Sequence, residues 1–226
     1  MQEKKTGKKR AFSRSRKPRT AQSIQSERLA KKTLRRRPRG PDGSLDSSQY
    51  MEIEEVRRLM RVITSKRDRS AFLIAYNRGL RAHEVGLLML SDFNRDRLFV
   101  RRGKGSISQE YSLTAEELHA LRMWIRERGK APGPLFPSRN HRPISRRRLD
   151  ELIKGYCEAA GIDRSKAHFH SLKHSIGTHL GDADYSAQDI QDALGHRRSS
   201  STAIYTHYSR KRREAMAERR RYWRVT

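Results

Sequence analysis

A histidine and a tyrosine near the end of the chain are residue types that can take part in nucleophilic chemistry. His196 directly follows a Leu-Gly pair, and Tyr205 lies nine positions later, beyond a short polar connection. A phenol has an ordinary pKa of about 10, so it attacks near neutral pH only beside a base or in a strongly cationic site. The pair therefore directs attention to basic groups elsewhere in the chain.

A second candidate group lies on a helix predicted to begin near His170. His170, Lys173 and His174 are spaced by three and four residues and project toward one side, whereas the apolar residues of this helix form a different stripe. A cationic cluster on one face favours an anionic ligand. A histidine metal site is the alternative, but a lysine between the two histidines opposes metal binding, and we expect no metal.

Composition favours a polyanionic partner. Lys and Arg outnumber Asp and Glu by 52 to 25, a net charge of +27, which suits nucleic acid. A membrane would also attract this charge, but no stretch approaches the roughly 20 apolar residues of a spanning helix, and the first 20 residues lack a signal core. We expect a cytoplasmic protein that is nucleoid-associated when bound to nucleic acid. Cys157 is the only cysteine, which excludes an internal disulfide, and we expect it in the core.

The elements that position these residues are mainly α-helices with a small antiparallel β-hairpin or sheet. Two alternating stretches, 97–102 and 108–113, predict the hairpin, with Lys104 in its glycine-flanked turn. Thr114 and Glu117 form a capping box. Helices are predicted over 47–63, 70–77, 81–90 and 114–129, in a segment ending near 160, from 170 onward, over 186–195 and over 201–209.

The charge is concentrated at the amino-terminal end. Residues 1–40 hold 16 Lys or Arg against two Glu, and a turn-rich hinge follows at 39–44. We expect residues 1–46 to form a disordered arm that contacts DNA phosphates, residues 47–209 to form the main domain, and residues 210–226 to form a basic helix.

Four segments together resemble a known family. They are "NRGLRAHEVGLLMLSDF", the glycine-flanked Lys104, "HFHSLKHSIGTHL" and "LGHRRSSSTAIYTHYS". In this order and spacing they resemble the tyrosine recombinases, the phage-integrase family of DNA strand-exchange enzymes. The likeness covers about residues 47–209 and implies the catalytic-domain fold of that family, in a compact form without a separate core-binding domain before it.

The resemblance assigns roles to the candidate residues. Tyr205 matches the nucleophile that forms a 3′-phosphotyrosyl link, with Tyr208 as the runner-up, and Lys104 matches the lysine that protonates the leaving oxygen. Glu84 and His174 match supporting positions. The cations and histidines expected around the phosphate are Arg81, His170, Lys173 and His196. Lys173 departs from the usual arginine, and lysine lacks the planar two-pronged donation of a guanidinium, so the activity is expected to be lower.

The resemblance implies double-stranded DNA as the partner, bound as a homotetramer through exchange of the C-terminal helix. It also implies accessory DNA-bending proteins and no cofactor. The rival readings are a non-catalytic nucleic-acid-binding protein and a DNA-relaxing enzyme like the type IB topoisomerases. Arginines expected to contact DNA are Arg35, Arg36, Arg37, Arg101, Arg102, Arg146, Arg147, Arg197 and Arg198.

Overall fold

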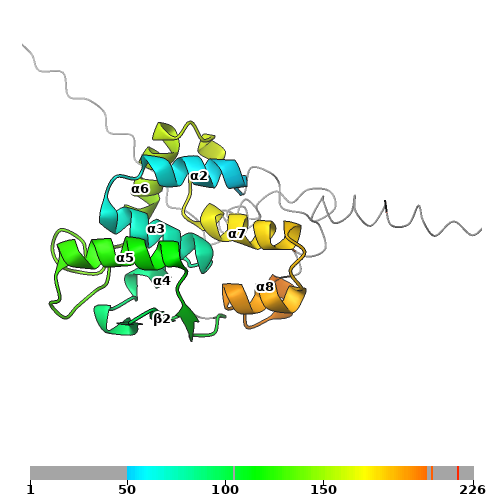
Figure 1. The fold of residues 1–226 in the computed structure, drawn as a ribbon. Coiled ribbons are helices and arrows are strands. Elements are labelled where there is room, and N and C mark those ends of the chain that lie inside the picture. Colours follow the sequence, from blue (N-terminus) through cyan, green and yellow to red (C-terminus); the bar gives the residue numbers. More distant parts are fainter. Residues whose placement is uncertain (1–49, 104, 203–204, 206–217, 219–226) are drawn as a thin grey trace, which may run out of the picture. The chain divides into compact units, whose positions relative to one another are not determined.

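The computed structural model describes residues 50–103, 105–202, 205 and 218 (Figure 1). This part of the chain is mainly helical with one small antiparallel sheet, which confirms the predicted fold class. The longer helices are α2 (Ile53–Val62), α3 (Lys66–Asn77), α5 (Ala115–Arg128), α6 (Arg146–Ala159), α7 (His170–Asp182) and α8 (Ala187–Leu194), and the short α4 spans Ala82–Gly86.

Helix α3 lies at the centre of the core, because most of its side chains are buried rather than one stripe alone. It packs against α5 on one side and α7 on another, and Figure 1 shows α5 running alongside it. Phe72 of α3 makes edge-on ring contacts with Tyr156 of α6 and with Phe169, at 5.7 and 5.3 Å between centroids. Cys157 is buried in the same core, as predicted.

The sheet has three strands in the order β1 (Phe93–Asn94), β2 (Arg97–Val100) and β3 (Gln109–Ser112). Strands β2 and β3 form the predicted hairpin, with Leu98 opposite Tyr111. The two-residue strand β1 was not predicted, because two residues are too few for an alternating pattern. Leu98 and Val100 are fully buried, so one face of β2 packs on the core.

The helix predicted over 81–90 is wrong in its extent, since α4 ends at Gly86. A Cβ atom at Gly86 would lie 2.8 Å from the carbonyl oxygen of Ile144, so the helix end fits closely against the chain before α6. Shortly beyond it, Met89 is extended and forms an antiparallel β-bridge with Pro134, and the Leu135 amide donates to the Leu88 carbonyl at 2.8 Å. The backbone after α4 therefore forms hydrogen bonds with this distant segment and does not continue as a helix.

The predicted helix signals at two other places are confirmed. Thr114 and Glu117 form the capping box of α5, and Ser186 caps α8. Gly195 ends α8 in the left-handed conformation, with φ of +60°. Most of the helix predicted over 201–209, the arm over 1–46 and nearly all of 210–226 lie outside the described residues. Among the described helices, none is long and apolar enough to cross a bilayer.

Candidate active site

Arg81 is held at the start of a helix whose first turn carries its carboxylate partner. Arg81 is the N-cap residue of α4, and Glu84 accepts hydrogen bonds from the Arg81 amide at 2.8 Å and from Arg81 Nη1 at 3.1 Å. Glu84 is fully buried, whereas the Arg81 side chain remains 31% exposed. The guanidinium is therefore fixed at one nitrogen while part of it still faces the solvent.

Glu84 is a carboxylate shared by cations from three elements. Burial by itself raises the pKa of Glu84, but the amides of Arg81 and Gly103 and the charges of Arg102 and Lys173 outweigh it and lower the pKa below its usual value. Glu84 is therefore ionised at neutral pH. When Lys173 is protonated, three cations surround this carboxylate, and the surplus positive charge suits an anion such as a phosphate.

Arg102 was predicted to contact DNA, and its burial contradicts that prediction. Its side chain has no exposed surface, because the alternation of β2 continues past the strand and directs it inward. The guanidinium donates to the carbonyls of Arg78 at 2.7 Å and Gly79 at 3.2 Å and to the Tyr111 hydroxyl at 2.8 Å. It also pairs with Glu84 at 3.3 Å. Arg102 thus supports the backbone that precedes Arg81.

Lys173 of α7 is buried, and its ammonium nitrogen points at backbone rather than at solvent. Nζ donates to the Gly79 carbonyl at 2.9 Å and to the Leu194 carbonyl at 3.2 Å. Burial, followed by the charges of the neighbouring guanidinium groups, lowers the pKa of Lys173 to about 7. The two acceptors lie two residues before Arg81 and two residues before His196, so Lys173 joins the backbone of both segments.

Tyr205 lies against one face of α7 with its hydroxyl beside a histidine. Its Oη is 3.1 Å from His174 Nδ1, and the residue is 4% exposed. The ring packs over Gly177, and the Tyr205 carbonyl oxygen approaches Gly181, where side chains would not fit. Burial raises the pKa of Tyr205 above its usual value, while the charge of Arg81 acts in the opposite direction.

His196 follows the left-handed Gly195 and stacks on Tyr205, with ring centroids 6.4 Å apart and an interplanar angle of 18°. Its Nδ1 lies 3.0 Å from the Thr202 hydroxyl. Burial, then the charge of Lys173, lowers the pKa of His196 to about 3, so the imidazole is neutral at pH 7. His170, the first residue of α7, makes an edge-on ring contact with His174 at 4.5 Å.

The hairpin turn is joined to the His196 turn by backbone pairing. Ser106 forms an isolated β-bridge with His196, and the Ile107 amide donates to the Gly195 carbonyl at 2.9 Å. The sequence neighbours of Lys104 therefore lie beside His196, although Lys104 itself is outside the described residues. Segments far apart in the sequence meet here and bring together Arg81, Glu84, Lys173, His174, His196 and Tyr205, with His170 at the edge of the group.

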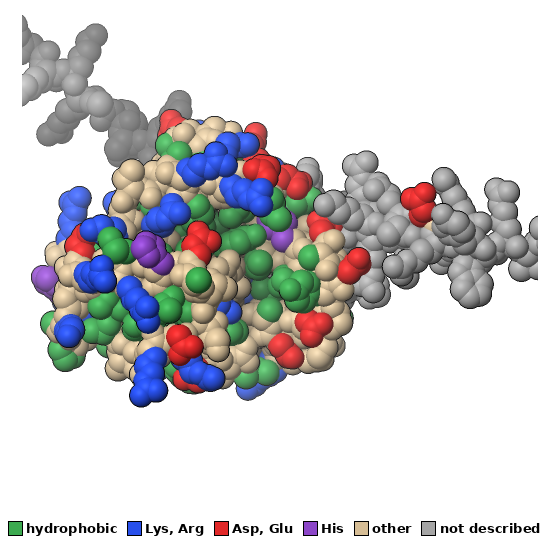
Figure 2. All heavy atoms as spheres, in the orientation of Figure 1, with side chains coloured by type: hydrophobic (Ala, Val, Ile, Leu, Met, Phe, Trp, Pro, Cys, Tyr) green, Lys and Arg blue, Asp and Glu red, His purple; other side chains and the backbone are tan. Residues whose placement is uncertain are grey.

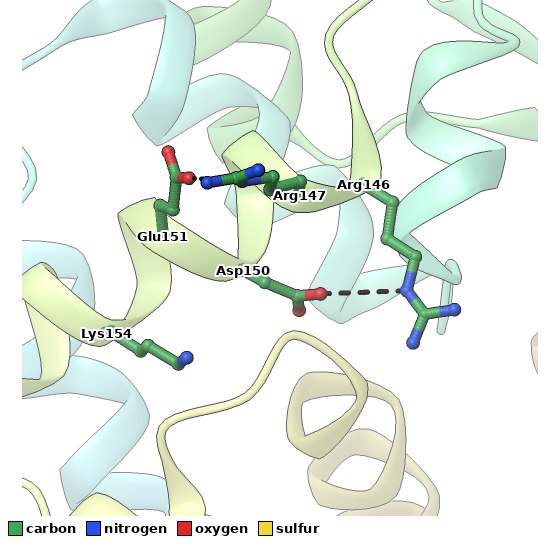
Figure 3. A pocket seen from close by; sticks show the side chains of 5 residues that line it. All are labelled: Arg146, Arg147, Asp150, Glu151 and Lys154. Atoms are coloured by element: carbon green, nitrogen blue, oxygen red, sulfur yellow. Dashed lines mark hydrogen bonds and ion pairs between the residues drawn. The ribbon is translucent and has the colours of Figure 1, made fainter. Parts of the chain in front are cut away.

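The arginines predicted to contact DNA differ in their surroundings. Arg146 and Arg147 are 79% and 90% exposed and line a surface pocket with Asp150, Glu151 and Lys154 (Figure 3). Each pairs with a carboxylate one turn later, Arg146 with Asp150 at 3.6 Å and Arg147 with Glu151 at 3.0 Å. Such exposed pairs are weak, so DNA phosphates can compete for these arginines.

Other predicted DNA contacts lie at the ends of the hairpin and of α8. Arg101 pairs with the buried Asp92, and Arg197 and Arg198 are exposed directly after His196. No ion pair holds Arg197 or Arg198 within the described part of the chain. On the face in Figure 2, Lys and Arg side chains are interspersed with acids, so this view shows no continuous basic surface. Arg35, Arg36 and Arg37 lie outside the described residues.

Several residues of the site were not anticipated from the sequence. Ser106 and Thr202 contact Arg81 and His196 through their hydroxyls, and no spacing rule distinguishes them from other serines and threonines. The two glycines of α7 carried a usable signal, because Gly177 and Gly181 are four residues apart and expose one helix face to close approach. Among the described residues, no group of three potential ligands could hold a metal ion.

Comparison with known proteins identifies relatives over the same region. The model of the phage integrase family matches residues 49–212. Tyrosine recombinase XerA of Thermococcus onnurineus is 36% identical over 160 residues, covering 68% of this chain and 56% of that protein. Tyrosine recombinase XerC of Xanthomonas axonopodis is 31% identical over 175 residues, covering 75% of this chain and 57% of that protein. The chain thus spans little more than half the length of these curated relatives.

Solved structures agree on the fold. A crystal structure of XerA recombinase superposes with a TM-score of 0.66 at 24% identity, covering 88% of this chain and 74% of that one. XerH recombinase in a post-cleavage complex with a palindromic difH substrate gives a TM-score of 0.64 at 25% identity, covering 74% of this chain and 52% of that one. The family match, the relatives and the shared fold lead to one conclusion: the chain belongs to the phage integrase family of tyrosine recombinases.

Proposed function

We infer that this chain cleaves and rejoins DNA at specific sites through a covalent tyrosine intermediate. The Tyr205 oxygen attacks the phosphorus of a DNA phosphodiester and forms a 3′-phosphotyrosyl ester. The bond to the 5′ oxygen breaks, and that oxygen takes a proton to become a free 5′-hydroxyl. Rejoining reverses these steps with a 5′-hydroxyl as the nucleophile. The ester conserves the bond energy, so the cycle needs no nucleotide.

The observation that carries this proposal is the position of the Tyr205 hydroxyl at the cationic cluster. Its Oη lies 3.1 Å from His174 Nδ1, and its ring stacks on His196. The positive charge of Arg81 lowers the pKa of the Tyr205 phenol, against the effect of burial. A tyrosine that only fills the core would not require two histidines beside its ring and hydroxyl. Simple DNA binding would not require this arrangement either.

The neighbouring groups divide the work of phosphoryl transfer. In the resting arrangement His174 Nδ1 lies 3.1 Å from the phenolic oxygen, and as the unprotonated nitrogen of its ring it can receive the phenolic proton. Arg81 binds the non-bridging oxygens, where negative charge increases in the transition state. His196, neutral at pH 7, offers its second ring nitrogen to the phosphate. Lys104 protonates the leaving 5′ oxygen.

Cleavage also requires a change in the position of Tyr205. At 4% exposure the ring is covered, and burial raises the pKa of its phenol, so this arrangement is a resting one. Movement of the segment around Tyr205 away from Gly177 on DNA binding would uncover the hydroxyl without unfolding α7. His174 and His196 would stay in place because they belong to α7 and to the turn after α8.

Double-stranded DNA is the proposed partner. XerH recombinase, which resembles this chain, was solved bound to its palindromic difH substrate, and the charge of +27 matches a polyanion. Four copies joined by exchange of residues 210–226, and accessory DNA-bending proteins, remain proposals that follow from the family. A basic arm over 1–46 would increase the affinity for DNA, and this contribution would decrease as the salt concentration rises.

The test measures covalent protein–DNA adducts formed on duplexes that carry candidate sites. A nick near the cleavage position lets the short cleaved fragment dissociate, so the covalent product accumulates. The wild-type chain should form an adduct that survives denaturation, and Tyr205→Phe should form none, because phenylalanine lacks the attacking oxygen. Tyr208→Phe is the matched control, since it removes the other candidate hydroxyl three residues away and should leave the adduct.

Binding of these duplexes is measured in parallel by gel shift. Loss of the adduct with intact binding in Tyr205→Phe supports the assignment. An adduct that persists in Tyr205→Phe refutes Tyr205 as the nucleophile, and binding without an adduct across a randomised site library favours a non-catalytic DNA-binding protein.

A further inference from the structure

The guanidinium of Arg81 is anchored through one of its three nitrogens. Arg81 Nη1 donates to Ser106 Oγ at 2.7 Å and to Glu84 Oε1 at 3.1 Å. Nη1 carries two hydrogens, so these two acceptors occupy it fully. Within the described residues, no hydrogen bond involves Nε or Nη2 of Arg81. The edge formed by Nε and Nη2 is left for a ligand, and this edge gives two-pronged binding to a phosphate.

Glu84 alone does not determine which edge of the guanidinium faces outward. A carboxylate can pair with either edge of a guanidinium, and the fully buried Glu84 is also engaged by the Gly103 amide at 3.1 Å and by Arg102 at 3.3 Å. A single contact to Nη1 would allow the planar group to rotate about it. The second acceptor, Ser106 Oγ, approaches from a different element and fixes the plane.

Ser106 is itself held firmly between two parts of the site. It is 9% exposed, its amide donates to the Gly103 carbonyl at 3.1 Å, and its backbone forms the bridge with His196. The position of its hydroxyl is therefore tied to the turn that carries His196. Through Ser106, the orientation of Arg81 is set relative to a histidine more than a hundred residues later in the chain.

We propose that Ser106 is a positioning residue that holds Nη1 of Arg81 and so presents the Nε–Nη2 edge to the scissile phosphate. This proposal rests on the proposed function, because it assigns Arg81 to the phosphate. Ser106 acts through Arg81. Its loss should slow the chemical step more than it weakens DNA binding, which many other cations share.

The first test compares Ser106→Ala, Ser106→Thr and Ser108→Ala in covalent-adduct formation at saturating nicked DNA. Ser108 is the matched control, because its hydroxyl also accepts a hydrogen bond in the same hairpin, at 2.9 Å, but from the Arg102 backbone. Ser106→Ala should slow adduct formation roughly 10- to 100-fold, as expected for losing a hydrogen bond to a charged group. Its Kd for DNA should stay within about twofold, and Ser106→Thr should restore most of the rate.

Equal rates in Ser106→Ala and Ser108→Ala would overturn the proposal, as would a loss confined to Kd. A second measurement does not depend on catalysis. In the free 226-residue chain, the guanidinium nitrogens of Arg81 are followed by nitrogen-detected NMR and assigned with Arg81→Lys. Ser106→Ala should speed rotation about the Nε–Cζ bond and merge the Nη signals, whereas Ser108→Ala should not.

The two measurements separate this proposal from the proposed function. A wild-type chain that never forms an adduct would refute the function, yet the NMR comparison would still test whether Ser106 orients Arg81. Unchanged Arg81 signals in Ser106→Ala would overturn the positioning role even if the enzyme is active.

Discussion

Replacing Gly177 by alanine tests directly whether Tyr205 docks on α7. A Cβ atom at Gly177 would lie 2.6 Å from Cε1 and from Cζ of the Tyr205 ring and 2.8 Å from Cδ1. Carbon atoms normally approach to about 3.5–4.0 Å, so the ring must move by about 1 Å or leave α7. Because Gly177 lies inside a regular helix, the substitution is otherwise a favourable one.

The matched control is Gly155→Ala in α6. Gly155 is exposed inside a helix, and no atom lies within 4 Å of the added Cβ. Alanine for glycine in a helix interior adds about 0.5–1 kcal/mol to the free energy of unfolding. Gly177→Ala gains the same amount, but overpacking of a close contact costs about 1–3 kcal/mol. We expect Gly177→Ala to be less stable than Gly155→Ala by about 1–3 kcal/mol.

Urea denaturation measures this difference, and a tyrosine titration reports on the ring itself. In protein labelled with ¹³C at tyrosine Cζ, the Tyr205 signal is assigned with Tyr205→Phe. Burial raises the pKa of this phenol, so Gly177→Ala should lower it toward about 10, whereas Gly155→Ala should not change it. Equal stabilisation by both alanines, with an unchanged Tyr205 pKa, would refute the packing of Tyr205 on α7.

Two further predictions concern the buried cations. Arg102→Gln leaves the Glu84 carboxylate without its buried partner and should cost about 3–5 kcal/mol of unfolding free energy. The control is Arg97→Gln, which removes an exposed ion pair with Glu110 and should destabilise the protein much less. Similar losses of stability for the two variants in urea denaturation would contradict this account. Burial lowers the pKa of Lys173 from its usual 10.5 to about 7, so between these pH values the unfolded chain binds the extra proton. The free energy of unfolding should therefore rise from pH 7 to 10 more steeply in the wild type than in Lys173→Met, and parallel curves would exclude the shifted pKa.

The sequence predicted the elements with strong local signals. The capping box at Thr114 and Glu117 and the stop at Gly195 depend on residues a few positions apart, and both are confirmed. The end of α4 was missed because the residues after it pair with a distant segment, where the Leu135 amide donates to the Leu88 carbonyl. Local pattern cannot reveal such a contact.

The sequence predicted those site residues whose type and spacing indicate their chemistry. It did not predict the features that depend on which way a side chain points in the folded protein. The resemblance named Arg81, His196 and Tyr205, and their segments do meet in space. It did not reveal that Arg102 points inward, because an arginine after a strand is more often exposed. Nor did it reveal that Lys173 donates to backbone carbonyls, because the direction of a buried ammonium depends on tertiary contacts.

Mass spectrometry of the covalent adduct tests the central claim most directly. The adduct formed on a nicked duplex is digested with nuclease and protease, and the peptide that retains a nucleotide is fragmented to locate it. We predict a nucleotide joined to the Tyr205 oxygen through its 3′ phosphate. A nucleotide on Tyr208, on a serine or on a histidine would contradict the account.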